Sequence, residues 1–169
     1  MTPVFRTAAL AAVASLSVAA PALAQPGGAL PTPQFISAAA STDEFERQEG
    51  RMAERQAASP QVRSFGQMMV RDHTNTTMAL KLAIHRAGLP PPPPPQLTPD
   101  QQASVPALKG LRGRDFDRTY LQQQIQAHQT ALGVMQAYAA SGGNRTLRKA
   151  AASTVPIVKH HLAMAQRIG

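Results

Sequence analysis

The sequence predicts an all-α protein, a bundle of four long helices. Ala, Gln, Met and Leu are frequent and aromatic residues make up only 4% of the chain, which favours helices packed through small side chains over sheets. Long stretches place apolar residues at steps of three and four, the spacing of one helix face. The 169 residues are enough for one domain with a real core. There is no cysteine, which excludes a disulfide framework, a thiolate metal site and a catalytic cysteine.

The first 24 residues have the features of a secretory signal peptide. One basic residue, Arg6, precedes a short apolar run, and Ala22-Leu23-Ala24 forms an A-x-A cleavage site. The run is shorter than the roughly 20 residues that a transmembrane helix needs, and no later segment is apolar enough to cross a bilayer. We therefore expect an exported, periplasmic protein that starts at Gln25 and opens with a flexible leader, residues 25–34.

The first long helix is predicted from Phe35 to about Ala58. Its apolar residues fall on one arc of the helical wheel, and most of its charged residues fall opposite. Two carboxylates, Glu46 and Glu49, lie one turn apart within the apolar arc. A carboxylate in that position must be paired, hydrogen-bonded, bound to a metal or pushed out at the helix edge. Both residues are therefore candidates for a functional site.

The second long helix is predicted from Pro60 to about Ala87, with Ser59 as its N-cap and the proline in the first turn. It carries the longest apolar stripe of the chain. The stripe consists of Val62, Phe65, Met69, His73, Thr76, Leu80, Ala83 and Ala87. His73, with Asp72 beside it, interrupts this stripe near its middle, which suggests a functional role.

A long connection, residues 90–113, joins the two predicted helical hairpins. Its six consecutive prolines, Pro90 to Pro95, span about 19 Å as polyproline II. Thr98 and Gln101 then fit a capping box that opens a short helix running towards Lys109. The stiff segment and the short helix together cover about the length of a bundle. The connection can therefore cross over, so that the second and third long helices run parallel.

The third long helix is predicted from Arg114 to Ser141, and the fourth follows a turn at residues 142–144. Each has a histidine on its apolar stripe, His128 in the third and His161 in the fourth. Pro156 should kink the fourth helix without ending it, because the pattern continues through the proline. Residues 35–169 thus predict a ferritin-like four-helix bundle with a Pro-rich crossover and a short extra helix.

Several short sequence motifs lie on these predicted helices. They are FE at Phe45-Glu46, GRMA at Gly50–Ala53, FGQMMVRDH at Phe65–His73, FDRTYL at Phe116–Leu121, the later His128, and VPIVKHHLAMA at Val155–Ala165. Together they resemble the bacterial domain of unknown function 4142 family over nearly all of the expected mature chain. The resemblance implies an exported, ferritin-like bundle and supplies no activity. It draws attention to Glu46, Asp72, His73, Asp117, Tyr120, His128 and His161, and it favours Glu46 over Glu49.

Each of the four long helices places a metal-competent side chain on its apolar stripe near mid-helix. These side chains are Glu46 or Glu49, His73, His128 and His161. An imidazole-rich site with one carboxylate suits zinc, copper or another late transition metal. Asp72, Asp117 and Tyr120 are available hydrogen-bond partners. The same histidines also fit a hydrogen-bonded core without a metal.

A di-iron oxidase site is disfavoured by the spacing around the histidines. Such bundles need a Glu-x-x-His motif on each of two helices. The residues three positions before His73, His128, His160 and His161 are Val70, Ile125, Ile157 and Val158. Both motifs are therefore missing.

Three functional hypotheses follow. The first is an exported, non-catalytic bundle with a structural or stress-related role. The second is a zinc- or copper-binding protein that uses the mid-bundle His/Glu site, and the third is a ferritin-like metal-dependent enzyme. The chain after residue 58 carries thirteen basic and four acidic residues, which favours anionic envelope components as partners. Specific nucleic-acid binding is disfavoured, because no aromatic residues are interleaved with the basic ones.

Overall fold

The structure is a computed structural model that describes residues 28–169. Its five helices are α1 (Thr32–Gln56), α2 (Pro60–Arg86), α3 (Pro99–Lys109), α4 (Gly113–Ser141) and α5 (Arg145–Ile168). Residues 28–169 contain no strand beyond an isolated bridge between Ala57 and Gly113, so the predicted all-α class is confirmed. None of these helices is long and apolar enough to span a membrane. The predicted signal peptide and the expected start at Gln25 lie outside the described residues.

Two helix starts follow the predicted capping chemistry, and α5 has a side-chain cap that was not predicted. The Ser59 side chain accepts a hydrogen bond from the Val62 N–H at the start of α2. Thr98 and Gln101 form the predicted capping box of α3. At the start of α5, the Asn144 side chain accepts from two backbone N–H groups. These side chains satisfy backbone donors that have no partner within the first turn of a helix.

Helix α1 begins earlier than its apolar pattern predicts. Residues 32–34, expected to belong to the leader, form its first turn. Proline is tolerated there, because its fixed φ suits a helix and its missing N–H is not needed in the first turn. The helix ends at Gln56, since Ala57 is already extended. In α5, by contrast, the helix continues through Pro156 as predicted.

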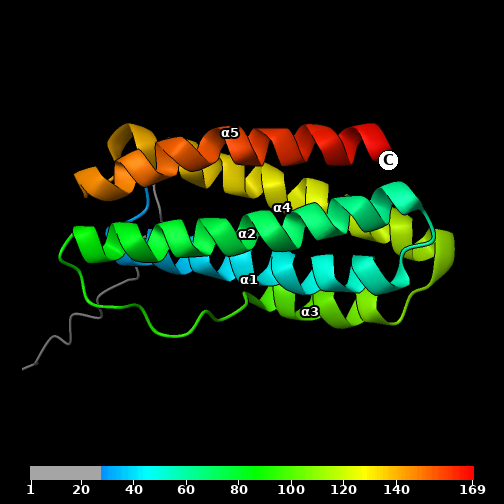
Figure 1. Ribbon diagram of the computed structural model, residues 1–169. Helices are drawn as coiled ribbons and strands as arrows, with labels where there is room; N and C mark the ends of the chain where they lie inside the picture. The colour runs from blue at the N-terminus through cyan, green and yellow to red at the C-terminus, as the bar shows by residue number, and fades with distance from the viewer. Residues whose placement is uncertain (1–27) are drawn as a thin grey trace, which may run out of the picture.

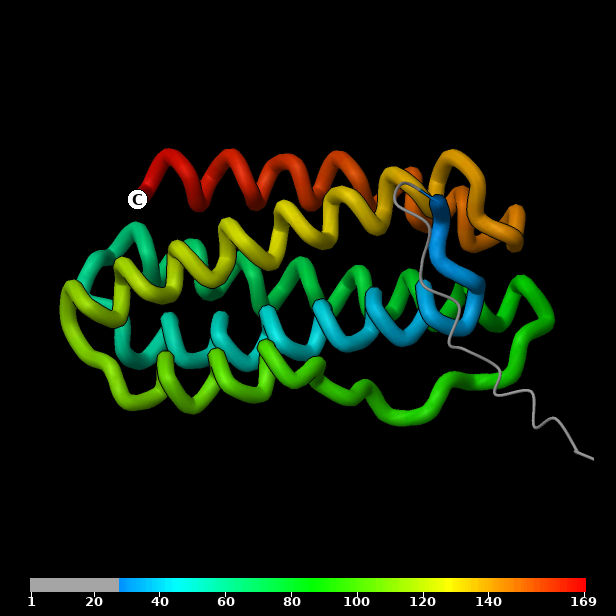
Figure 2. Tube along the Cα trace, turned by 180° about the vertical axis from the view of Figure 1, so that it is seen from behind, coloured from blue at the N-terminus to red at the C-terminus, as the bar shows by residue number. Residues whose placement is uncertain are grey.

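The four long helices form a bundle in which each packs against two neighbours. Helix α1 packs against α2 and α4, and α5 packs against the same two helices. The connection after α2 runs back along the outside of the bundle and continues into α3 (Figure 1). Helix α3 packs on α1 and α4. As a result α2 and α4 run parallel, which both views show (Figures 1 and 2).

Two hydrophobic clusters fill the two ends of the bundle. The Phe65 cluster comprises Met52, Ala53, Ala57, Val62, Phe65, Met69, Leu108, Phe116, Tyr120, Leu121 and Ala165. The Tyr138 cluster comprises Phe35, Ile36, Ala39, Ala83, Ile84, Met135, Tyr138, Leu147 and Ala151. Along every long helix, the residues between these two sets include buried polar side chains. The bundle therefore has apolar ends and a polar middle.

Helices α1 and α2 approach each other closely at two glycines. A Cβ atom on Gly66 would lie 2.6 Å from the Ala53 Cβ and 2.9 Å from the Gly50 carbonyl oxygen. A Cβ atom on Gly50 would lie 2.9 Å from the Gly66 carbonyl oxygen. Only glycine fits this contact without a backbone shift, and the contact sets the spacing of the first hairpin.

Candidate metal centre

The polar middle of the bundle, here called the histidine layer, contains a side chain from each long helix. The layer consists of Asp43, Glu46, Glu49, His73, Thr76, Gln124, His128 and His161, all of them buried. His73, His128 and His161 each offer a ligand atom, and these atoms lie within 4.8 Å of one another. The mid-helix level predicted for these histidines is the level at which the structure brings them together.

Each of the three histidines uses one ring nitrogen for a partner outside the group. His73 Nδ1 lies 2.8 Å from Asp43 Oδ1, and His161 Nε2 lies 3.1 Å from Asp72 Oδ2. His128 Nδ1 lies 2.8 Å from the Gln124 carbonyl oxygen. A neutral imidazole donates from one nitrogen only. In the neutral form of each ring, these bonds leave His73 Nε2, His128 Nε2 and His161 Nδ1 as the nitrogens with free lone pairs, the arrangement that metal-ligating histidines use.

The remaining nitrogens of His128 and His161 face each other directly. His128 Nε2 and His161 Nδ1 are 3.3 Å apart. With the outer bonds in place, both atoms carry lone pairs, and two buried acceptors that face each other are unfavourable until a cation lies between them. Two imidazole nitrogens bound at 2.0–2.1 Å to one tetrahedral ion would be separated by about 3.3 Å. The separation of His128 Nε2 and His161 Nδ1 therefore matches the separation of two nitrogen ligands of one tetrahedral ion.

Glu46 adds a carboxylate to the three imidazoles. It is fully buried, with Oε2 2.5 Å from His73 Nε2 and Oε1 3.3 Å from His128 Nδ1. Apart from these two imidazoles, no group within residues 28–169 donates a hydrogen bond to the Glu46 carboxylate. A buried carboxylate without aligned donors is costly unless a charge compensates it. Glu46 is thus placed as the counter-ion of a protonated histidine; it is not among the residues whose ligand atoms lie within 4.8 Å of one another, and it would have to move to become a fourth ligand.

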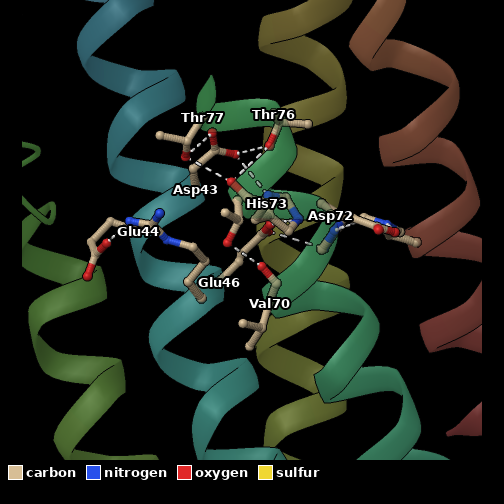
Figure 3. Close-up of polar contacts among 12 residues, drawn as sticks. Asp43, Glu44, Glu46, Val70, Asp72, His73, Thr76 and Thr77 are labelled. Atoms are coloured by element: carbon tan, nitrogen blue, oxygen red, sulfur yellow. Dashed lines mark hydrogen bonds and ion pairs between the residues drawn. The ribbon is translucent and has the colours of Figure 1, made fainter. Parts of the chain in front are cut away.

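Asp43 holds His73 in place and is itself held by two threonines. The hydroxyl groups of Thr76 and Thr77 donate to Asp43 Oδ1 and Oδ2 at 2.8 and 2.9 Å. Figure 3 shows this carboxylate between α1 and α2, with Glu46 on the other side of His73 and Asp72 on the side of α2 that faces α5. Asp43, His73 and the two threonines form one connected network, which fixes the His73 ring.

Electrostatics assign different charges to the three histidines. Burial alone would lower the pKa of His73, but the charge of Glu46 and the hydrogen bond to Asp43 raise it to about 10. Burial lowers the pKa of His128, and burial together with the charge of His73 lowers that of His161 to about 4. Burial would raise the pKa of Glu46, yet the neighbouring His128 and His73 lower it. The metal-free layer at neutral pH therefore contains one imidazolium, two neutral imidazoles and an ionised Glu46.

The other predicted site residues lie in different places. Glu49 does not join Glu46 at the histidines; its Oε2 accepts from Gln124 Nε2 at 2.9 Å. Asp72 is the predicted partner of a histidine, and it pairs with His161. Tyr120 packs in the Phe65 cluster, 6.0 Å from the rings of Phe65 and Phe116, with no hydrogen bond to its hydroxyl.

The prediction that Asp117 supports the histidines is wrong. Its carboxylate accepts from the backbone N–H groups of Ala58 and Ser59, at 3.0 and 2.8 Å. It therefore closes the turn between α1 and α2, at the end of the bundle. The physical reason is that this turn leaves two backbone donors free, and a carboxylate at the start of α4 reaches them.

Three contributors to the layer were not predicted as site residues: Asp43, Gln124 and Thr76, although Thr76 lies on the stripe predicted for the second long helix. Each lies one helical turn from a predicted residue, Asp43 three before Glu46, Gln124 four before His128 and Thr76 three after His73. Residues at these spacings share a helix face. Extending each predicted position by one turn along its face would have found all three.

The comparisons with known proteins identify a family model and two structures. The model described as "Domain of unknown function (DUF4142)" matches residues 17–168. CopM in the Cu(I)-bound form has a TM-score of 0.68 at 17% identity, over 82% of this chain and 94% of that chain. CopM in the Cu(II)-bound form has a TM-score of 0.68 at 16% identity, over 82% of this chain and 95% of that chain. The comparison with curated proteins found no match. At these identities the structural likeness shows the helical fold.

Proposed function

The chain belongs to the domain of unknown function 4142 family, as its motifs indicate, and from that premise we propose that it binds one transition-metal ion in the histidine layer. The family description names no activity, so the proposal depends on geometry. The observation that carries it is the convergence of three buried imidazoles within 4.8 Å, each with its second nitrogen held by an outer acceptor. Such outer partners orient metal-ligating histidines and set their tautomers.

The ligands in this proposal are His73 Nε2, His128 Nε2, His161 Nδ1 and a Glu46 oxygen. Copper(II) is expected to bind more tightly than zinc, because divalent ions follow that order at sites of nitrogen and oxygen ligands. The copper-bound forms of CopM, which share the fold, support copper by analogy. With Glu46 as the fourth ligand a tetrahedral ion has no open position for a substrate, which would favour metal holding over catalysis, whereas the three imidazoles alone leave one position open.

Metal titration of the metal-free protein tests the proposal. Native mass spectrometry and calorimetry with copper(II) and zinc should show one ion per chain. Free metal at a hundred times its Kd should stabilise the fold by about 2.7 kcal/mol, seen as a shift of the thermal melt that a chelator reverses. Because His73 is protonated in the metal-free layer, binding at pH 7 should release about one proton per ion. Calorimetry in buffers of different ionisation enthalpy measures that release.

A matched pair of variants on α5 provides the control. His161→Ala should abolish the stoichiometric adduct, whereas His160→Ala should retain it, because His160 is exposed and only one residue away. Circular dichroism checks that both variants remain helical. If wild type forms no stoichiometric adduct and its melt is unaffected by chelator, the layer is a buried ion-pair network. The structural or stress-related role would then be favoured.

We also propose that the protein is exported to the periplasm and loses residues 1–24. The support is the short apolar run and the A-x-A site in the sequence. The intact mass of the protein released from cells by osmotic shock checks this. A mass that includes residues 1–24, in the membrane fraction, would contradict it.

A further inference from the structure

Helices α2 and α5 enclose a groove of about 760 Å³ on the outside of the Tyr138 cluster. It follows α2 from Asn75 to Arg86 and α5 from Arg145 to Ile157. At 1.5 Å per residue its length is about 17 Å. Both the volume and the concave shape are in the range of sites that bind small molecules.

The charges that line the groove all have one sign and lie at one end. Arg86, Arg145 and Lys149 line it, and all three side chains are exposed. No acidic residue lines the groove, and α5 as a whole carries five basic residues and no acidic one. The far end, at Asn75, Ser153 and Ile157, is uncharged. An anionic group would therefore be attracted to one end only.

Apolar side chains line the wall beside these cations. Ala79, Ala83 and Ala150 lie along the groove together with Leu82. Leu82 is 48% exposed, which makes it one of the two large hydrophobic side chains exposed in residues 28–169. Exposed apolar surface beside a charged rim is typical of a binding surface. A ligand could cover Leu82 and recover the free energy of burying it.

We propose that this groove binds a single-chain lipid amphiphile, with its anionic headgroup at Arg86, Arg145 and Lys149 and its aliphatic chain along Leu82 towards Ile157. An acidic helix as long as the groove would need cations along its whole length, whereas Arg86, Arg145 and Lys149 lie near one end and the rest of the groove is uncharged. One anionic head and one apolar chain match both the charge distribution and the length. The groove shares only Thr76 with the histidine layer and none of the proposed metal ligands, so it does not depend on the metal proposal.

Calorimetry and native mass spectrometry with dodecanoate below its micellar concentration test the proposal. Dodecanoate should bind once per chain, whereas dodecyltrimethylammonium, with the same chain and a positive head, should not bind measurably. The double variant Arg145→Glu, Lys149→Glu should weaken dodecanoate binding at least tenfold. Higher salt should weaken binding by the wild type, because the head contacts are exposed ion pairs.

The control variant reverses the charge of two exposed basic residues outside the groove. Arg114→Glu, Arg118→Glu changes the net charge by the same amount at the start of α4 and should leave binding unchanged. Leu82→Ser should weaken dodecanoate binding while its helicity stays that of wild type, because Leu82 is exposed. Equal binding of both amphiphiles, uptake of many molecules per chain, or no effect of the groove variants would overturn the proposal. Binding of an acidic helical peptide in place of dodecanoate would overturn it too.

Discussion

Glu49 is a buried carboxyl group whose ionisation should control how stability depends on pH. Burial raises its pKa from 4.5 to about 8, against the hydrogen bond from Gln124. The folded state then binds a proton that the unfolded state releases. This contribution to stability is complete below pH 4.5 and is lost as pH rises through 8. At 1.36 kcal/mol per pKa unit, the loss is on the order of 5 kcal/mol.

Glu49→Gln tests this. A glutamine is neutral at every pH and can still accept from Gln124, so the variant should be more stable than wild type at pH 9 and similar to it at pH 4. Urea unfolding of the metal-free proteins across this range gives the difference. Subtracting the free energy of unfolding of wild type from that of the variant at each pH cancels the contributions from the titration of His73 and His161, which both proteins share. A constant difference in stability from pH 4 to pH 9 would contradict the prediction, because it would show that the pKa of Glu49 is the same in the folded and unfolded states.

At the scale of single residues, sequence periodicity predicted the candidate metal ligands better than it predicted the residues that hydrogen-bond to them. It placed Glu46, His73, His128 and His161 on inward faces, because helical spacing determines which face a residue occupies. It could not choose between Glu46 and Glu49, since both share that face and only the packing of the neighbouring helices separates them. Asp117 was misplaced for a similar reason: the backbone donors that it binds are created by the turn, which periodicity does not describe.

At the scale of helices, the Gly50–Gly66 contact determines how closely α1 and α2 pack. Gly66→Ala puts a methyl group 2.6 Å from the Ala53 Cβ, so the helices must separate. Overpacking of this kind costs about 1–3 kcal/mol, and the variant should be less stable than wild type in denaturant unfolding. The gain in helix propensity from replacing glycine offsets only part of this cost.

Gly133 provides the matched comparison on α4. It is an exposed mid-helix glycine with nothing near the position of its Cβ. Gly133→Ala should therefore stabilise the protein by about 0.5–1 kcal/mol through propensity alone. If both alanine variants were more stable than wild type, the close approach of α1 and α2 at Gly66 would not make a larger side chain there destabilising.

Helix boundaries were less predictable than helix faces. The first turn of α1, residues 32–34, was expected in the leader because it contains a proline beside other breakers. A proline is equally suited to the first turn of a helix, so the residue type alone cannot decide between the two. The capped starts at Ser59 and Thr98 were predicted correctly, because a side-chain acceptor there has a specific backbone donor to satisfy.

At the scale of the whole molecule, the topology followed from length and stiffness. Six prolines and a short helix reach from one end of the bundle to the other, which allowed the parallel arrangement of α2 and α4 to be predicted. The groove between α2 and α5 could not be predicted, because it depends on how far two helices from different hairpins separate. Sequence patterns describe each helix by itself, and they contain no information about that distance.

The four proposed metal ligands of the histidine layer divide equally between the two hairpins. Glu46 and His73 lie on the hairpin of α1 and α2, whereas His128 and His161 lie on the hairpin of α4 and α5. Neither hairpin alone contains the whole set. Because contacts within a hairpin are local, we expect each hairpin to form early and the two to dock late in folding.

This division has a kinetic consequence. A metal ion that needs all four side chains can stabilise only the docked state, so its contribution should be absent from the folding transition state. Bound metal should slow unfolding in proportion to its stabilisation and leave the folding rate unchanged. Stopped-flow unfolding and refolding with and without zinc would separate the two rates. Faster refolding with zinc would mean that the hairpins dock before the rate-limiting step. An effect on unfolding alone would mean that the ion binds after the rate-limiting step of folding and dissociates before the rate-limiting step of unfolding.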